Sequence, residues 1–199
     1  MSPLGERLAY TLIQLPSRCD HQYFDTLYRF LSALPRSGAD GSSRHYAVEI
    51  RALNLSQAQS HHPGLFAEVN ALLSSTRTER VWMDTRPLRA APQPWDEPTR
   101  LAMQRKPNLP VYPIGLGPAP MVRYVAHPLI DANLQWLNDW ADVFCTWLNE
   151  GRTPFFFAHY PGETLAPQVA RLFYKLLTQK MKTLPPPPIW PSEKQMSLF

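Results

Sequence analysis

The sequence contains few cysteines, no long hydrophobic run and no leader-like start. Its two cysteines, Cys19 and Cys145, lie far apart, and neither has a CxxC companion. This arrangement argues against a disulfide framework or a zinc site and is typical of proteins from a reducing, cytoplasmic environment. The chain has no run of about 18 apolar residues and no charged N-terminal region followed by an apolar one, so we expect neither a membrane span nor a secretory signal.

Several short catalytic and ligand-binding motifs are missing as well. The sequence has no HxxxH pair, no nucleophile elbow and no glycine-rich phosphate loop, and the GLG triplet at 115–117 is too short for a dinucleotide fingerprint. His61 and His62 are adjacent in a polar segment, but a metal site there would need a third ligand that the sequence does not place. The formal net charge of +4 permits an anionic partner without requiring one. The cofactor, including any divalent metal, therefore stays open.

The sequence does contain a repeated pattern of short apolar segments that end in polar residues. The clearest example is 80–95, where an apolar core (81–83) ends in Asp84 and Arg86 before Pro87. Four more segments follow the same pattern: 8–16, 45–51, 121–128 and 153–163. An apolar run that ends in charged residues and a proline-rich loop is typical of a buried parallel strand that carries side chains to a functional face.

Amphipathic helical segments separate these strands. Apolar residues recur at helical spacing in 24–34 and 132–149, and we expect further helices at about 63–75, 97–106 and 166–182. Gly151 is predicted to cap the longest helix, whose tryptophans are interpreted as packing residues. Strands that alternate with helices predict an α/β fold built of five β/α units.

The strand ends supply the candidate functional residues. In a β/α barrel the residues at the carboxyl ends of the strands face one pocket, so the polar residues there would form a ring. Glu49, Asp84 and His127 are predicted to act as acid and base or to bind a divalent metal. The residues predicted to hold a phosphate or carboxylate are Gln14, Arg51, Arg86, Arg123 and His159. The alternative interpretation is structural: Glu49–Arg51 and Asp84–Arg123 would be buried ion pairs that stabilise the mouth of the barrel.

These segments, in their order, resemble the YecE-like family (domain of unknown function 72). The motifs that carry the resemblance are LIQLP, HYAVEIR, MDTRP, MVRYVAHP and FFFAHYPGE, together with DTRPLRAAP and QRKPNLPV, and they extend over essentially the whole chain. The resemblance implies a TIM-type β/α barrel in a bacterial cytosolic protein. It implies no reaction.

The chain departs from the family pattern in its first part. Three further strands, with GTSGW-like, VE-N-like and F-F-K-P-like motifs, would precede the SPL sequence, which here occupies residues 2–4. We therefore expect the C-terminal five β/α units of an incomplete TIM-type barrel, and prefer a truncated reading frame to a half-barrel that pairs with another chain. Five strands cannot close a barrel, so self-association through the open sheet edge is predicted.

The family pattern also differs at the last two strands. They end in YVAH and FAHY, where many members have FHGR and FNND. This difference weakens any assignment of a catalytic role from the family to these two strand ends.

The C-terminus forms a separate segment. We expect residues 1–183 to form the partial barrel and 184–199 a proline-rich tail, in which four consecutive prolines favour polyproline II. The last five residues, QMSLF, resemble the pentapeptide by which bacterial proteins bind the DNA polymerase sliding clamp. Gln195 would hydrogen-bond at the edge of the clamp pocket, while Leu198 and Phe199 would insert into it. The alternative is a terminus whose last apolar residues fold back on the barrel.

Two classes of function remain open. One is a DNA-associated protein, such as a barrel enzyme of nuclease or repair type, tethered to the sliding clamp by the QMSLF peptide. The other is a barrel enzyme that acts on a small phosphorylated or acidic substrate. A truncated product without activity is a third alternative.

Overall fold

The protein forms a five-stranded parallel sheet in which every strand pairs with its neighbour in sequence. The computed structural model describes residues 8–52, 56, 63–187 and 189. The strands are β1 (Thr11–Gln14), β2 (Tyr46–Glu49), β3 (Glu79–Asp84), β4 (Met121–Val125) and β5 (Phe155–His159). Parallel neighbours need a crossover connection, and each of the four connections here contains an α-helix. The expected α/β class is confirmed.

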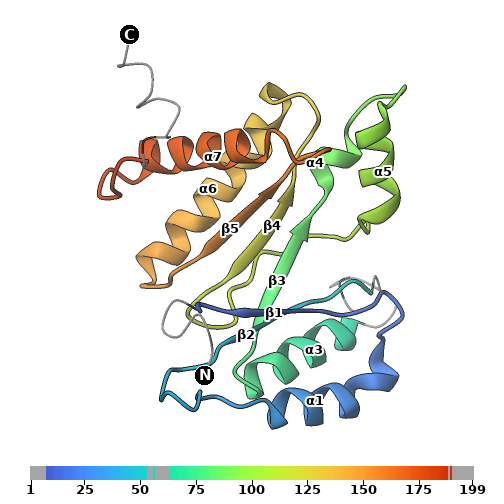
Figure 1. Ribbon diagram of the computed structural model, residues 1–199, viewed down its shortest axis with the longest axis vertical. Helices are drawn as coiled ribbons and strands as arrows, with labels where there is room; N and C mark the ends of the chain where they lie inside the picture. The colour runs from blue at the N-terminus through green and yellow to red at the C-terminus, as the bar shows by residue number, and fades with distance from the viewer. Residues whose placement is uncertain (1–7, 53–55, 57–62, 188, 190–199) are drawn as a thin grey trace.

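Helices cover the outer face of the sheet (Figure 1). α1 (Phe24–Ala33) and α3 (Pro63–Ser75) pack against the N-terminal half of the sheet, while α6 (Leu134–Asn149) and α7 (Ala166–Lys180) pack together against β4 and β5. The connection between β3 and β4 contains α4 (Arg86–Arg89) and α5 (Glu97–Arg105), near the carboxyl ends of the strands. Two 3₁₀ turns, η2 (His21–Tyr23) and η3 (Asp131–Asn133), precede α1 and α6.

Each strand contributes to two layers, because successive residues of a strand point to opposite faces. The outer face is buried against the helices, and its strand residues include Val48, Trp82, Val122, Tyr124 and Phe156. The inner face carries a smaller apolar cluster, formed by Tyr10, Ala47, Val81, Met121 and Phe155. Most of the apolar burial therefore lies between the sheet and its helices.

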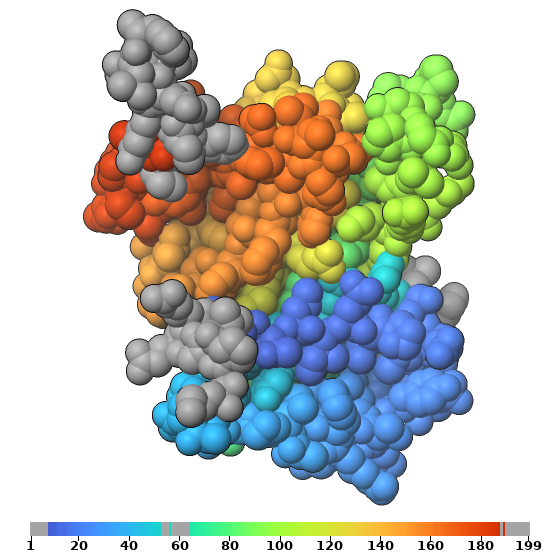
Figure 2. Space-filling model, viewed as in Figure 1, coloured from blue at the N-terminus to red at the C-terminus, as the bar shows by residue number. Residues whose placement is uncertain are grey.

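The sheet is curled, and its two outermost strands are exposed. Every residue of β2 and β3 is buried, whereas β1 and β5 contain only partly buried and exposed residues. The strand order ends with β1 on one side and β5 on the other, so the sheet is a curled half-barrel with two edges. Figure 2 shows the residues around β1 (dark blue) at the surface, with α1 (lighter blue) beside them.

The helices and strands lie close to their predicted ranges, with three differences. The first strand is Thr11–Gln14 rather than 8–16, because only these residues pair with β2. The proline pattern does not predict the short helix α4. Pro87 nevertheless fits there, because it lies in the first turn, where the backbone N–H that proline lacks has no partner within the helix. The longest helix begins at Leu134, since Asp131–Asn133 form a 3₁₀ turn.

The predicted glycine cap of α6 is confirmed. Gly151 has a φ of 76°, in the left-handed region that glycine adopts without strain. Its N–H donates to the carbonyl of Leu148 at 3.0 Å, and the N–H of Arg152 donates to the carbonyl of Trp147 at 2.9 Å. These two bonds form a Schellman motif, which satisfies carbonyl groups at the end of the helix. Trp140 and Trp147 of α6 are buried, as their interpretation as packing residues requires.

The start of the proline-rich tail contacts the folded part of the chain. Leu184 packs against the outer-face core, and the carbonyl of Pro185 accepts a hydrogen bond of 2.8 Å from the hydroxyl of Tyr174. The predicted clamp-binding residues Gln195, Leu198 and Phe199 lie outside the described residues, as does the 61–62 histidine pair. Within the described ranges, no helix combines the length and the apolar character needed to span a membrane.

Candidate functional site

A polar cavity opens at the carboxyl ends of the strands. Its volume is about 550 Å³, and it is bounded by β4, β5, helix α5 and the loop after β5. We call it the mouth cavity, and its polar lining includes Gln14, Arg51, Arg105, Lys106, Arg123, His159 and Glu163. Ligands of β/α proteins bind at this end of the strands.

Arg123 lies at the centre of the hydrogen-bond network in the mouth cavity. Its side chain extends from the inner face of β4 and forms an ion pair with Glu49 of β2. It also donates to the Oε1 atom of Gln14 at 3.3 Å and to the Nε2 atom of His159 at 3.1 and 3.2 Å. Arg123 therefore connects β1, β2 and β5 across the concave side of the sheet.

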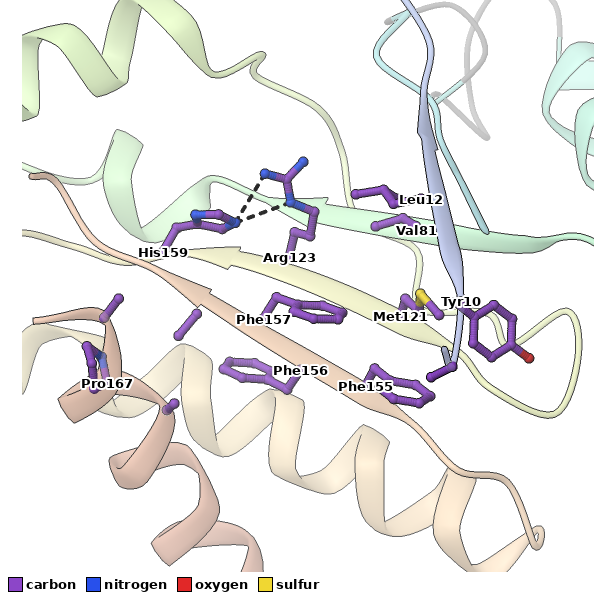
Figure 3. A pocket seen from close by; sticks show the side chains of 14 residues that line it. Tyr10, Leu12, Val81, Met121, Arg123, Phe155, Phe156, Phe157, His159 and Pro167 are labelled. Atoms are coloured by element: carbon purple, nitrogen blue, oxygen red, sulfur yellow. Dashed lines mark hydrogen bonds between the residues drawn. The ribbon is translucent and has the colours of Figure 1, made fainter. Parts of the chain in front are cut away.

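His159 lies beside Arg123 (Figure 3) and connects it to the loop after β5. Because its Nε2 atom accepts from Arg123, the ring proton is on Nδ1, which donates to Oε1 of Glu163 at 3.2 Å. Burial is the main cause that lowers the pKa of His159; Lys106 and Arg123 lower it further, and Glu163 opposes them. The neutral ring is thus favoured, and it serves as an acceptor for Arg123.

The Glu49 side chain is fully buried beneath this network. The second carboxylate oxygen, Oε1, lies 3.8 Å from Nε of Arg51, too far for a hydrogen bond. Among the residues that the structure describes, neither of these two atoms has a hydrogen-bond partner. The Nη2 atom of Arg51 instead donates to the carbonyl of Arg105 at 2.8 Å, which links β2 to the end of α5. The predicted Glu49–Arg51 ion pair is thus present, but at long range.

Lys106 is a mouth residue that the sequence reasoning missed. It follows α5, lines the cavity, and forms no side-chain hydrogen bond or ion pair within the described part of the chain. Burial lowers the pKa of Lys106, and the nearby guanidinium groups of Arg123 and Arg51 lower it further, against the opposing effect of Glu163 and Glu49. A sequence signal exists: the basic pair 105–106 precedes Pro107 in a long connection between two predicted strands.

Asp84 and Arg86 do not join the mouth ring. The Asp84 side chain is fully buried toward α6, where it accepts a hydrogen bond of 2.8 Å from the indole Nε1 of Trp140. Its other contacts are to Arg86, whose Nη2 lies 2.8 Å and whose Nε lies 3.0 Å from the carboxylate. The suggested Asp84–Arg123 ion pair is therefore wrong: Asp84 pairs with Arg86, and Arg123 pairs with Glu49.

His127 also lies apart from the mouth network. It is buried in the loop after β4, where its Nδ1 atom accepts a 2.9 Å hydrogen bond from the backbone N–H of Leu129. Asn133 holds the same loop, since its Oδ1 accepts from the His127 backbone N–H at 2.8 Å. Burial lowers the pKa of His127. The predicted convergence of Glu49, Asp84 and His127 is therefore not found.

The resulting chemistry is that of a cationic cavity. Four basic side chains line it, and three carboxylates oppose them: Glu97 and Glu163 of the lining, and Glu49, the partner of Arg123. These three charges neutralise the four basic ones only in part. Across the ranges that the structure describes, no three His, Cys, Asp or Glu side chains are grouped so that they could hold a metal ion. The site is thus suited to an anion, which arginine and lysine bind through charge-assisted hydrogen bonds.

Comparisons with known proteins give the family of the chain. The family model described as "Protein of unknown function DUF72" matches residues 1–195. The chain is 28% identical to UPF0759 protein YecE of Escherichia coli K12 over 205 residues, a match that covers 100% of this chain and 68% of the relative. YecE of E. coli O157:H7 is 27% identical, with the same coverage.

Two solved structures share the fold. A DUF72 family protein from Enterococcus faecalis V583 has a TM-score of 0.52 and 16% identity, over 92% of this chain and 63% of that one. A DUF72 family protein from Thermotoga maritima MSB8 has a TM-score of 0.52 and 13% identity, over 87% of this chain and 57% of that one. The chain thus spans less than two thirds of the length of either structure. Since the family model extends over nearly all of its residues, the chain belongs to the DUF72 family of proteins of unknown function.

Proposed function

We propose that the mouth cavity binds a small phosphorylated or carboxylated compound, at the carboxyl end of a TIM-type β/α barrel. The observation that carries the proposal is the placement of Lys106. Its ammonium group lies within electrostatic range of Arg123 and Arg51, as well as of the carboxylates of Glu163 and Glu49, and the described part of the chain supplies it with no hydrogen-bond partner. Like charges repel one another in a partly buried cavity, and an anionic ligand relieves this repulsion.

The two classes of side chain in the cavity have different roles in this proposal. The ammonium group of Lys106 contacts the anion, and Arg51, which also lines the cavity, adds positive charge beside it. Arg123 is already paired with Glu49, so it orients the cavity and adds positive potential. The neutral His159 keeps the Arg123 side chain in place through the two hydrogen bonds to its Nε2 atom.

The test is a calorimetric titration with inorganic phosphate at constant ionic strength. We expect saturable binding that Lys106→Met weakens about tenfold or more, because a hydrogen bond to a charged group contributes about 1.5–3 kcal/mol. Lys175→Met is the matched control, since Lys175 is exposed on α7 and does not line the mouth cavity. Absence of saturable binding, or equal effects of the two lysine changes, contradicts the proposal.

A second candidate function rests on the C-terminal sequence. We propose that Gln195, Leu198 and Phe199 bind the bacterial DNA polymerase sliding clamp, which would bring the protein to replicating DNA. The support is the likeness of QMSLF to the clamp-binding pentapeptide and its position after a proline-rich spacer. This function is independent of the mouth cavity.

A peptide of residues 194–199 tests the second candidate by fluorescence anisotropy with purified clamp. The expected dissociation constant is on the order of micromolar, because little area is buried and the peptide must be ordered. Changing Leu198 and Phe199 together to Ala should remove binding, Gln195→Ala should weaken it, and Ser197→Asp should preserve it. Binding that is insensitive to the double alanine change would refute a clamp-specific motif.

A further inference from the structure

The backbone that carries Lys106 is fixed at the edge of the mouth cavity. The carbonyl groups of residues 105–107 each accept a hydrogen bond from a side chain. Arg51 donates to the first carbonyl at 2.8 Å, Arg89 of α4 to the second, and Thr85 to the third at 3.0 Å. The segment is thus attached to the ends of β2 and β3 and to α4. A side chain on such a segment has a defined position.

The tip of the Lys106 side chain has no comparable attachment. It lines the cavity, and its ammonium group forms no hydrogen bond or ion pair within the described part of the chain. The wall beside it is partly apolar, because Met83, Leu101 and Val125 also line the cavity. Such surroundings solvate an ammonium group poorly and disfavour its charged form. A lysine with a fixed backbone and an amine without a protein partner is suited to act on a ligand.

The charges around Lys106 act in the same direction. Burial lowers the pKa of Lys106, and the guanidinium groups of Arg123 and Arg51 lower it further. Glu163 and Glu49 oppose this effect. A lower pKa increases the fraction of neutral amine at neutral pH. Desolvation and a neighbouring cation are the two ways in which proteins activate lysine as a nucleophile.

We propose that Lys106 forms an imine with an aldehyde or ketone that carries a carboxylate or phosphate group. This inference rests on the proposed binding of anions in the mouth cavity, and it adds the reactive group of the ligand. The positive charge of Arg51 and Arg123 attracts the anionic group, and the carbonyl carbon lies against the Lys106 amine. Inorganic phosphate has no carbonyl carbon, so it meets only the ammonium form of Lys106.

The reaction is a condensation that needs no oxidant or reductant. The Lys106 ammonium first gives one proton to Glu163, a carboxylate of the cavity lining within electrostatic range. The nitrogen lone pair then forms a bond to the carbonyl carbon, while the C=O π electrons move to the oxygen, which takes a proton from the nitrogen. The hydroxyl leaves as water with the proton held by Glu163, and a protonated imine remains. Its positive charge is stabilised by the anionic group of the ligand.

The distribution of lysines in the sequence allows the reacting residue to be identified. The other lysines all lie at or after residue 175: Lys175, Lys180, Lys182 and Lys194. None of the three that the structure describes lines the mouth cavity. A modification at Lys106 is therefore found on a different peptide from a modification at any other lysine.

The experiment treats the full 199-residue chain with glyoxylate, an aldehyde that carries a carboxylate, in the presence of cyanoborohydride. Cyanoborohydride reduces an imine to a stable amine, and peptide mass spectrometry locates it. At pH 7 we expect modification of Lys106 to be at least about tenfold faster than modification of Lys175, because binding holds the carbonyl next to the amine. Inorganic phosphate should slow the reaction at Lys106 and leave the reaction at Lys175 unchanged.

Two controls separate the imine from other reactions. Lys106→Arg keeps the positive charge but supplies no neutral amine, so the fast modification should be lost. Propionaldehyde carries no anionic group, and its preference for Lys106 over Lys175 should be smaller than that of glyoxylate by about threefold or more.

The outcomes distinguish this proposal from the binding of anions. Saturable phosphate binding without faster modification of Lys106 overturns the imine and leaves the proposed anion binding intact. An equal preference for Lys106 with propionaldehyde and glyoxylate also overturns the proposal, because the ligand would then need no anionic group. The absence of both phosphate binding and fast modification overturns the proposed function together with the imine.

Discussion

Asp84 and Glu49 are both fully buried carboxylates at strand ends, yet they face opposite sides of the sheet. Asp84 points toward α6, and Trp140 of α6 and Arg86 of α4 donate hydrogen bonds to it. Glu49 points into the mouth, where Arg123 is its partner. Substitutions of the two carboxylates should therefore have different effects, although both residues lie at the end of a strand in the sequence.

Asp84→Asn should lower the melting temperature and leave phosphate binding unchanged. The substitution removes charge from an acceptor of hydrogen bonds from Trp140 and Arg86, at a cost of about 1–3 kcal/mol. Asp142→Asn is the control, because that carboxylate is exposed and its ion pair with Lys180 contributes at most about 1 kcal/mol. Thermal unfolding and the phosphate titration measure the two effects. Loss of binding with unchanged stability would instead support the predicted catalytic role of Asp84.

Arg123→Met should destabilise the protein strongly. The change leaves the Glu49 carboxylate buried without its ion-pair partner, which costs about 3–5 kcal/mol. The double change Glu49→Met, Arg123→Met should recover much of this loss, since it removes both charges from the interior. Urea unfolding of the two single variants and the double variant gives the coupling energy. Additive effects would mean that the ion pair makes no net contribution to stability.

The face of each carboxylate follows from strand alternation, which is readable in the sequence. Trp82 and Asp84 have the same parity, so an outward-facing tryptophan places the aspartate outward as well. The predicted ring of polar residues included every polar strand end, and therefore did not take this alternation of side chains into account. His127 was beyond such reasoning, because it lies past the end of β4, where the hydrogen bonds of Asn133 fix the chain.

Among the elements, helices and strands could be predicted well, but their short neighbours could not. Helix α3 begins and ends at the predicted residues, and helix α5 ends one residue before its predicted end. Apolar periodicity over several turns carries this information. One-turn elements such as α4 and η3 have no periodicity, so only the hydrogen bonds of the folded chain define them. For the same reason, the position of Lys106 over the mouth depends on where α4 and α5 turn the chain.

Gly151 and Gly64 should respond to alanine with opposite signs. Gly151→Ala forces a side chain into left-handed backbone geometry and should lower the free energy of unfolding by about 1–2 kcal/mol. Gly64 lies in α3, where an added Cβ would meet, among the described residues, only the Glu68 carboxylate at 3.7 Å, an ordinary contact. Gly64→Ala should therefore raise stability by about 0.4–1 kcal/mol. Chemical denaturation of both variants gives the sign of each change in the free energy of unfolding. Equal changes would contradict the role of Gly151 as the cap of α6.

For the whole molecule, one buried and one partly buried histidine predict a loss of stability in mild acid. Burial lowers the pKa of His127 and of His159 in the folded state, relative to about 6.5 for an unfolded chain. Below that value the unfolded state binds more protons than the folded state, so the free energy of unfolding falls as the pH decreases. We expect the decrease to begin as the pH falls below about 6.5, above the range in which most carboxylates titrate.

Urea unfolding at a series of pH values measures this dependence. The variant His127→Asn, His159→Gln should have a flatter profile between pH 7 and pH 5, because neither amide is protonated there. His21→Asn is the control, since His21 is exposed in η2. A profile that keeps its slope in the double variant would assign the acid sensitivity to other groups.

The tryptophans of the helical layer provide a fluorescence signal that distinguishes this layer from the mouth cavity. Trp140 shares a hydrogen bond with Asp84, and its ring centre lies 6.2 Å from that of Trp147, close enough for excitation energy to pass between them. Within the described ranges, no tryptophan lines the mouth cavity. The emission of Trp140 and Trp147 should therefore follow the interface between α6 and the sheet and stay nearly constant when an anion enters the mouth. A change in emission on ligand addition would then indicate that the ligand signal reaches the helical layer.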